Sequence, residues 1–153
     1  MSHPKRTPAA EAATGLVLDL FRLSNRLAAS GDRLVAPLGL TSARWQILGA
    51  IIATERPQPV AWLARDMGVS RQNVARIVGD LTEQGLVALQ PNPHHRRAPL
   101  VVLTEKGAQA FEAAMGLQAP WINRLVEGLA VEAIETTHEI LAALRRKLEA
   151  EER

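Results

Sequence analysis

The fold is decided by residues 63–104, which read LARDMGVSRQNVARIVGDLTEQGLVALQPNPHHRRAPLVVLT. Their first part has the spacing of a helix-turn-helix motif, in which one short amphipathic helix ends at Gly68 and a second begins near Arg71. Ser70 can cap the second helix, because its hydroxyl can accept a hydrogen bond from a backbone N–H group of the first turn. Gly85 is placed to end that helix. The stretch therefore predicts two helices with marked ends, joined by a tight turn.

The two faces of the second helix differ sharply. At roughly 100° per residue, one face gathers the apolar residues and must be buried: Val74, Ile77, Val78 and Leu81. Gln72 and Arg76 point the opposite way, Asn73 lies on the flank, and Gly79 would let a partner approach the backbone closely. Amide side chains can bond adenine edges, and arginine can bond guanine or a phosphate. This face favours DNA contact; the alternative is an ordinary solvated helix face.

A hairpin with a basic tip follows. Two β-prone runs, 86–90 and 98–104, are joined by the turn-rich segment PNPHHRR at 91–97. Proline lacks a backbone donor, so the prolines suit the tip and the exposed edge of a two-stranded ribbon. Arg96 and Arg97 would lie near the tip, where a guanidinium can enter a narrow minor groove. The alternative is a solvated basic turn.

Three segments follow one another along the chain and can be compared with known families: GLTSARWQIL at 39–48, VAWLARDMGVSRQNVARIVGDLTEQGLV at 60–87 and NPHHRRAPLVVLTEKG at 92–107. Together they resemble the MarR family of winged-helix transcriptional regulators, over nearly the whole chain. The resemblance implies a mainly α-helical winged helix-turn-helix with a small antiparallel β wing. It also implies that the helix matching 71–84 enters the major groove of double-stranded DNA and that the hairpin matching 86–103 touches the minor groove.

The candidate DNA-binding residues lie on the second helix with its cap and on the wing: Ser70, Arg71, Gln72, Asn73, Arg76, His95, Arg96 and Arg97. The wing of the family usually carries Asp, any residue, then Arg, at the positions of the last three. Arg97 matches the minor-groove arginine. His95 replaces the usual Asp, so the ion pair that commonly steadies that arginine cannot form in the same way.

Composition agrees with a helical protein of one domain. Of 153 residues, 47% are hydrophobic but only 3% aromatic, so the core must be mainly aliphatic. There is no cysteine, which excludes a disulfide, a thiolate metal site and a cysteine redox switch. The net charge of +2 is modest for a nucleic-acid binder, but basic groups gather at 71–76 and 94–97.

The ends of the chain predict a tail and two dimerisation helices. Residues 1–10 are polar and are expected to be a disordered tail, and 11–153 to form the MarR-type domain with its DNA-binding core at 40–107. Leucine stripes run through 11–36 and the last part of 120–153. Neither stripe has an obvious partner within a small winged-helix core, so we expect both helices to pair with a second copy in a homodimer. The alternative is that the stripes pack together in a monomer.

Other elements are marked by caps and breaks. Thr41 is predicted to cap a helix whose buried face is Ile47, Leu48, Ile51 and Ile52. A break is expected at 56–59, and Thr104 is expected to cap a later helix in which Pro120 starts a new segment or a kink. Trp62 and Trp121 are interpreted as packing residues.

No motif in the sequence indicates an enzyme active site. It contains no HExxH or GxSxG pattern and no glycine-rich phosphate loop, so we expect neither an enzyme nor a cofactor. His94, His95 and His138 could in principle bind zinc with glutamates, but solvated or phosphate-facing histidines are the simpler interpretation. No apolar run reaches the roughly 18 to 20 residues that cross a bilayer, and the first ten residues do not form a secretory signal. We therefore expect a cytoplasmic protein with no membrane partner.

The resemblance also implies an effector crevice between the dimerisation helices and the core, for a small aromatic or phenolic anion. Trp45 matches a position at its border, and Arg22, Arg26 and Arg44 could supply a cation; the alternative is that Trp45 belongs to the core. The sequence thus predicts a homodimeric repressor that binds a pseudo-palindromic operator and is released by a small molecule. The alternatives are a winged-helix protein-interaction module and a ligand-sequestering protein without specific DNA binding.

Overall fold

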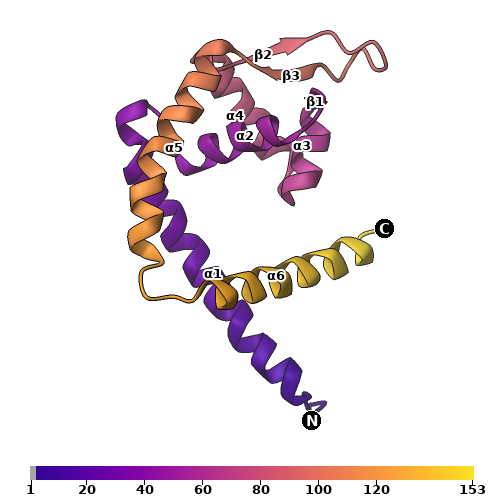
Figure 1. Ribbon diagram of the computed structural model, residues 1–153. Coiled ribbons are helices and arrows are strands. Elements are labelled where there is room, and N and C mark those ends of the chain that lie inside the picture. Colours follow the sequence, from indigo (N-terminus) through magenta and orange to yellow (C-terminus); the bar gives the residue numbers. More distant parts are fainter. Residues whose placement is uncertain (1–2) are drawn as a thin grey trace. The chain divides into compact units, whose positions relative to one another are not determined.

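The computed structural model describes residues 3–153, and the chain divides into two units, the second of which begins at Ala119 (Figure 1). The elements in order are α1 (Pro8–Val35), the 3-10 helix η1 (Ala36–Leu38), α2 (Ser42–Ala53), β1 (Gln58–Pro59), α3 (Val60–Met67), α4 (Arg71–Glu83), β2 (Val87–Gln90), β3 (Leu100–Leu103), α5 (Glu105–Leu125) and α6 (Val131–Glu151). The architecture is mainly α-helical with a small antiparallel sheet, as predicted.

The first helix begins earlier than its leucine stripe suggests. Thr7 caps α1, because its Oγ1 accepts a hydrogen bond of 3.1 Å from the backbone N of Ala10, and Pro8 occupies the first helical position. The helix therefore starts at Pro8 rather than near Glu11, and the last part of the expected disordered tail is helical. Met1 and Ser2, also part of that tail, lie outside the described residues.

The helix-turn-helix has the predicted ends. Gly68 ends α3 with a φ of 67°, in the left-handed region that favours glycine. Ser70 caps α4 by accepting a hydrogen bond of 3.1 Å from the N of Asn73. Gly85, with a φ of 73°, follows the last residues of α4. The predicted apolar face of α4 is buried: Val74, Ile77, Val78 and Leu81.

The core of the first unit packs this face against α2, α3 and the sheet. Thr41 caps α2, as predicted, by accepting a hydrogen bond from the N of Arg44. Ile47, Leu48 and Ile51 are buried, but Ile52 is 45% exposed, contrary to expectation. Ile52 lies about 100° beyond Ile51 around the helix axis, which carries its side chain past the edge of the contact face.

The sheet has three strands, in the order β1-β3-β2, and not the two predicted. The expected break at 56–59 contains β1, whose Gln58 pairs with Val101 and whose Pro59 pairs with Leu100. Strands β2 and β3 are antiparallel from Val87 opposite Leu103 to Gln90 opposite Leu100. Pro59 is tolerated because β1 is an edge strand, where a missing donor need not break the ladder.

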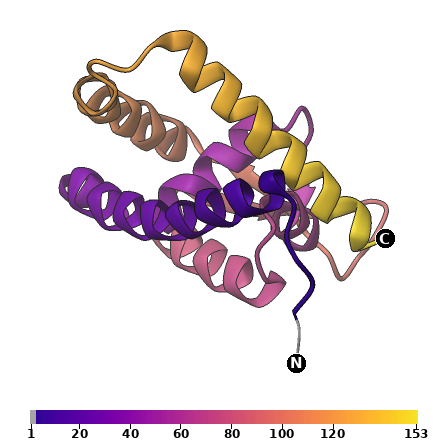
Figure 2. The same cartoon turned by 90° about the horizontal axis from the view of Figure 1, so that it is seen from below.

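The second unit continues from α5 into α6. Helix α5 runs through Pro120 to Leu125, so Pro120 does not start a new helix; the break comes later, where Gly128 has a φ of 81° before α6. Figure 2 shows α1 and α6 each as one unbroken helix. Within residues 3–153 no single helix is long and apolar enough to cross a membrane, and only the bent pair 8–38 with 42–53 passes by length and composition.

Candidate nucleic-acid interface

Helix α4 carries a compact set of exposed hydrogen-bonding side chains, in which Gln72 and Arg76 are exposed as predicted: Arg71, Gln72, Asn73 and Arg76. Gly79 lies on the same exposed face, and no heavy atom would come within 4 Å of a Cβ at this position. The backbone there is therefore open to a close approach from outside. The face offers amide donors and acceptors together with guanidinium groups, which are the groups that recognise base edges and phosphates.

Arg76 is held in place by its neighbours on α4. Its Nη2 donates a hydrogen bond of 2.9 Å to Oδ1 of Asn73, and its Nη1 lies 4.0 Å from Oδ2 of Asp80. The same Asp80 oxygen is 3.4 Å from Nη2 of Arg44 on α2. One carboxylate thus lies between two guanidiniums, and it limits the directions in which Arg76 can point. We did not single out Asp80 in the sequence, although an acid four residues after Arg76 is a recognisable helix pair.

Arg44 belongs to this cluster. Besides Asp80, its guanidinium bonds Oε1 of Gln84 at 3.4 Å, and Gln84 in turn donates from Nε2 to the carbonyl of Gly39 at 2.9 Å. These contacts tie α4 to α2 and to the turn after η1. The Arg44 guanidinium, predicted as an effector cation, is thereby engaged with Asp80 of α4 and with Gln84.

The wing loop is shaped by an asparagine. Nδ2 of Asn92 donates to the carbonyl of Ala98 at 2.9 Å, and Oδ1 of Asn92 accepts from the N of His94 at 3.0 Å. Two backbone bonds add to this, from the N of His95 to the carbonyl of Asn92 and from the N of Ala98 to the carbonyl of His95. A side-chain amide closing its own turn in this way is typical of asparagine, but we did not assign Asn92 this role from the sequence.

The three basic wing residues lie on this clamped loop, and all are exposed: His95, Arg96 and Arg97. Figure 1 shows the loop extending from the end of the sheet. Among residues 3–153, no ion pair includes Arg96 or Arg97. The clamp by Asn92 therefore orders the loop without consuming either guanidinium.

The root of the wing is fastened to the end of α4. Thr104 donates from Oγ1 to the carbonyl of Gly85 at 2.7 Å and accepts from the N of Gly107 at 3.0 Å, which makes it the predicted cap of α5. Lys106 Nζ donates to the carbonyl of Gln84 at 2.8 Å. A Cβ at Gly107 would collide with the carbonyl oxygen of Leu86. These contacts join the end of α4, the root of the wing and the first turn of α5.

The other predicted effector residues are not drawn together by contacts. Trp45 is half-buried and packs against the core, Arg26 is exposed on α1, and Arg22, also exposed, lies 3.9 Å from Asp19. In the described part of the chain no hydrogen bond or ion pair joins Arg22 or Arg26 to Trp45. The effector crevice of this chain therefore remains a prediction.

The two tryptophans interpreted as packing residues differ. Trp121 is half-buried, but Trp62 is 51% exposed, contrary to expectation. The guanidinium of Arg65 lies over the Trp62 ring, 5.2 Å from its centroid. Trp62 lines a cavity beside the wing. Within residues 3–153 no group of three or more histidines, aspartates and glutamates is arranged to hold a metal ion.

Comparison with known proteins places this geometry in context. The model of the MarR family matches residues 38–98. An uncharacterised protein of Mycobacterium tuberculosis is 38% identical over 136 residues, which cover 89% of this chain and 94% of that protein. The transcriptional activatory protein BadR of Rhodopseudomonas palustris is 36% identical over 107 residues, which cover 67% of this chain and 59% of BadR.

Solved structures show the same fold. The crystal structure of CouR from Rhodococcus jostii, bound to p-coumaroyl-CoA, is similar with a TM-score of 0.75 at 21% sequence identity, over 84% of this chain and 90% of CouR. At this level of identity the likeness bears on the fold alone. The fold of CouR is thus similar to the arrangement of helices and strands described above.

Proposed function

Because the chain belongs to the MarR family of DNA-binding transcriptional regulators, we propose that it reads a pseudo-palindromic operator as a homodimer, with α4 in the major groove. The observation that carries this proposal is the exposed face of α4, where Asn73 and Asp80 orient Arg76 and where Gln72 is exposed. A pre-oriented guanidinium loses less conformational freedom when it binds. Pre-orientation therefore favours the use of Arg76 in recognition.

Each candidate residue has a role in this proposal. Gln72 and Asn73 face base edges, with adenine as the natural partner of an amide, and Arg76 bonds guanine or a phosphate. Ser70 and Arg71 lie at the start of α4, where a helix N-terminus favours a phosphate. The exposed wing residues His95, Arg96 and Arg97 contact the minor groove and its phosphates.

Exposed apolar residues support the homodimer. Helix α1 leaves a run of large side chains at the surface: Val17, Leu18, Leu20, Phe21, Leu23 and Leu27. Helix α6 does the same with Val131, Ile134, Ile140 and Leu148. Apolar surface on this scale is rarely left in water, so we propose that both helices pair with a second copy. Two recognition helices would then read sites about one helical turn, or roughly 34 to 36 Å, apart.

We further propose that a small aromatic or phenolic anion releases the dimer from DNA, and that Trp45 borders its crevice. The structure of CouR with p-coumaroyl-CoA bound, an aromatic thioester, supports this class of molecule. A dimer that leaves its operator on binding a ligand acts as a repressor wherever the operator overlaps a promoter. BadR is named an activator, so the direction of regulation is tested separately. The protein acts in the cytoplasm, with the DNA it binds.

A gel-shift assay with the DNA upstream of the protein's own coding sequence tests the proposal. We expect a retarded complex that survives an excess of unrelated duplex, because specific binding exceeds non-specific binding by about 10³ or more. The variant Arg76→Ala should lose most of this preference, whereas Arg33→Ala, which removes an exposed arginine from α1, should keep it. Binding that every duplex competes away equally would overturn specific recognition. A reporter gene behind the same DNA then separates repression from activation.

A further inference from the structure

A cavity of about 660 Å³ lies beside the wing, and no residue of α4 lines it. One wall is formed by residues 56–59, which include β1, and by Trp62 at the start of α3. The other wall is formed by residues 92–95 and Ala98 of the wing loop, and Leu100 of β3 joins the two. We call it the wing cavity. Its volume falls in the range of roughly 300 to 1,000 Å³ that is usual for small-molecule sites.

The walls of the wing cavity suit a flat apolar group. Trp62 is 51% exposed. Exposing the large apolar ring of a tryptophan to water costs free energy, which a ligand covering the ring would recover. The rings of Pro57, Pro59 and Pro93 line the same space. The guanidinium of Arg65 lies 5.2 Å from the centroid of the Trp62 ring, and this cation–π contact steadies the indole. An aromatic ring can therefore stack on a surface that is already ordered.

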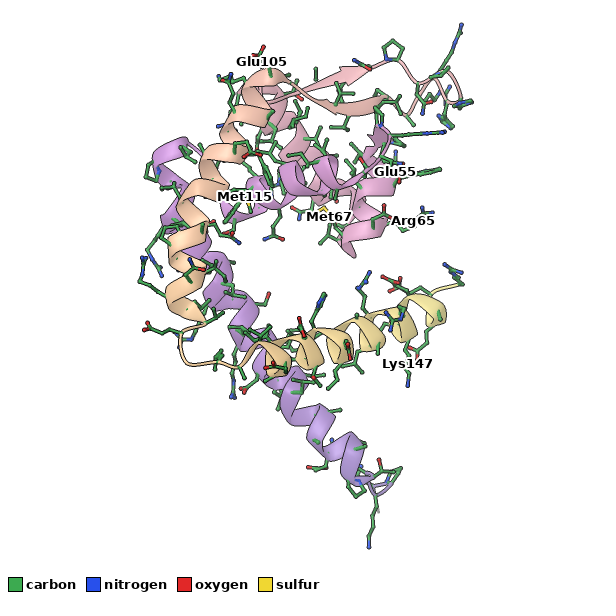
Figure 3. The ribbon with its side chains drawn as sticks, viewed as in Figure 1. Glu55, Arg65, Met67, Glu105, Met115 and Lys147 are labelled. Atoms are coloured by element: carbon green, nitrogen blue, oxygen red, sulfur yellow. The ribbon has the colours of Figure 1, made fainter. Side chains whose placement is uncertain are left out.

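The charged residue that lines the wing cavity is basic. Arg56 lines it with His94 and His95, whose imidazole N–H groups can donate to a carboxylate, and none of its lining residues is acidic. Glu55 lies in the turn before β1 (Figure 3) but does not line the cavity. Figure 3 also shows Arg65 projecting from α3. The site thus combines an apolar floor with donors for an anion.

We propose that the wing cavity binds a small planar aromatic anion, at a site separate from the crevice beside Trp45, and that its occupation weakens DNA binding. The second half rests on the proposed function. His94 and His95 line the cavity and precede Arg96 and Arg97 on the same clamped loop. Asn92 belongs both to the cavity wall and to the clamp, through its bond to Ala98. A ligand that engages this wall competes with DNA for the position of the loop.

Calorimetric titration of the full chain with 2-naphthoate, in the absence of DNA, tests the site. Its uncharged counterpart 2-naphthamide has the same rings, and we expect it to bind at least about tenfold more weakly, the loss of one charge-assisted contact. Trp62→Ala and Arg56→Gln should each weaken naphthoate by about fivefold or more. Arg33→Gln, an unrelated exposed arginine, should change it less than twofold. Thermal melting checks that each variant is folded.

Several results would overturn the site. They are no binding of naphthoate at millimolar concentration, equal binding of the amide, or a loss on Arg22→Gln that Trp62→Ala and Arg56→Gln do not reproduce. The last would place the ligand beside Trp45. Because these titrations contain no DNA, they stand even if specific DNA binding is refuted.

A second experiment tests whether occupation of the wing cavity weakens DNA binding. DNA affinity is measured with and without saturating naphthoate. We expect naphthoate to lower DNA affinity at least about threefold in the unmodified protein and clearly less in Trp62→Ala. If naphthoate does not change the DNA affinity of the unmodified protein, the effect on DNA binding is refuted, but the ligand site is not. If Trp62→Ala and Arg56→Gln weaken DNA binding strongly while neither affects naphthoate, the cavity receives the DNA backbone, and the ligand site is refuted.

Discussion

Changing Asp80 to Asn removes the charge that lies between Arg44 and Arg76 while it keeps the size of the side chain. The carboxylate oxygen is 3.4 Å from one guanidinium and 4.0 Å from the other, and the Asp80 side chain is 36% exposed. At that exposure solvent screens each pair, so we expect the free energy of unfolding to fall by only about 1 kcal/mol. The change is therefore mild enough for the variant to fold and to be assayed on DNA.

The effect on DNA reading should be larger than the effect on stability. Arg76 keeps its bond to Asn73 but loses the restraint from Asp80, so its guanidinium explores more directions. A good base-edge contact is worth about 1 to 3 kcal/mol. Losing about 1 kcal/mol of it in each half-site would lower specific affinity about fivefold per half-site and about thirtyfold for a dimer. Non-specific affinity should rise slightly, because a negative charge near the phosphates is gone.

Fluorescence anisotropy with an operator duplex and a scrambled duplex measures both affinities. The matched control is Glu83→Gln, which removes a charge from the same helix; in the described residues Glu83 belongs to no ion pair. We expect this control to change the ratio of specific to non-specific affinity less than twofold. If Asp80→Asn lowers the melting temperature but leaves that ratio as it was, Asp80 is structural and does not orient Arg76.

Four further outcomes are expected. Gln72→Ala should cost about 1 to 3 kcal/mol on the best operator and relax preference at one base position per half-site, as scored by binding to a library of substituted operators. Removing residues from Ala130 onward should give a monomer by light scattering and abolish tight binding; a folded monomer with full affinity would refute the dimer. Gly107→Ala should lower the urea-measured free energy of unfolding by at least about 2 kcal/mol, because its Cβ meets the Leu86 carbonyl. Gly79→Ala should leave stability equal or higher by up to about 1 kcal/mol yet weaken operator binding, if DNA approaches the backbone there.

Local signals in the sequence predicted the helix-turn-helix. Ser70, Gly68 and Gly85 mark helix ends by their own backbone and side-chain chemistry, and the buried face of α4 follows from helical spacing alone. None of these features needs a distant partner. The same logic predicted Thr41 and Thr104 as caps. Where the decisive contacts lie within one turn of a helix, sequence and structure agree.

Features made by distant partners could not be predicted in this way. Strand β1 has two residues, too few for alternation to show, and it exists only because β3 supplies its ladder. Arg44 and Asp80 are 36 residues apart, so nothing local indicates that they meet. Trp62 has the character of a core residue, and the cavity that it lines has its other wall thirty residues later, beginning at Asn92.

In the wing, hydrogen bonds from Asn92 take the place of an ion pair that His95 cannot make. With His95 at the position where the family usually carries Asp, the usual ion pair to Arg97 cannot form in the same way. Asn92 orders the loop instead, through neutral hydrogen bonds to His94 and Ala98. Neutral bonds of this kind are hardly weakened by salt, whereas a surface ion pair is. In the described residues neither Arg96 nor Arg97 has an acidic partner that DNA would have to displace. In the proposed complex, both guanidiniums of this clamped loop can therefore meet the phosphates directly.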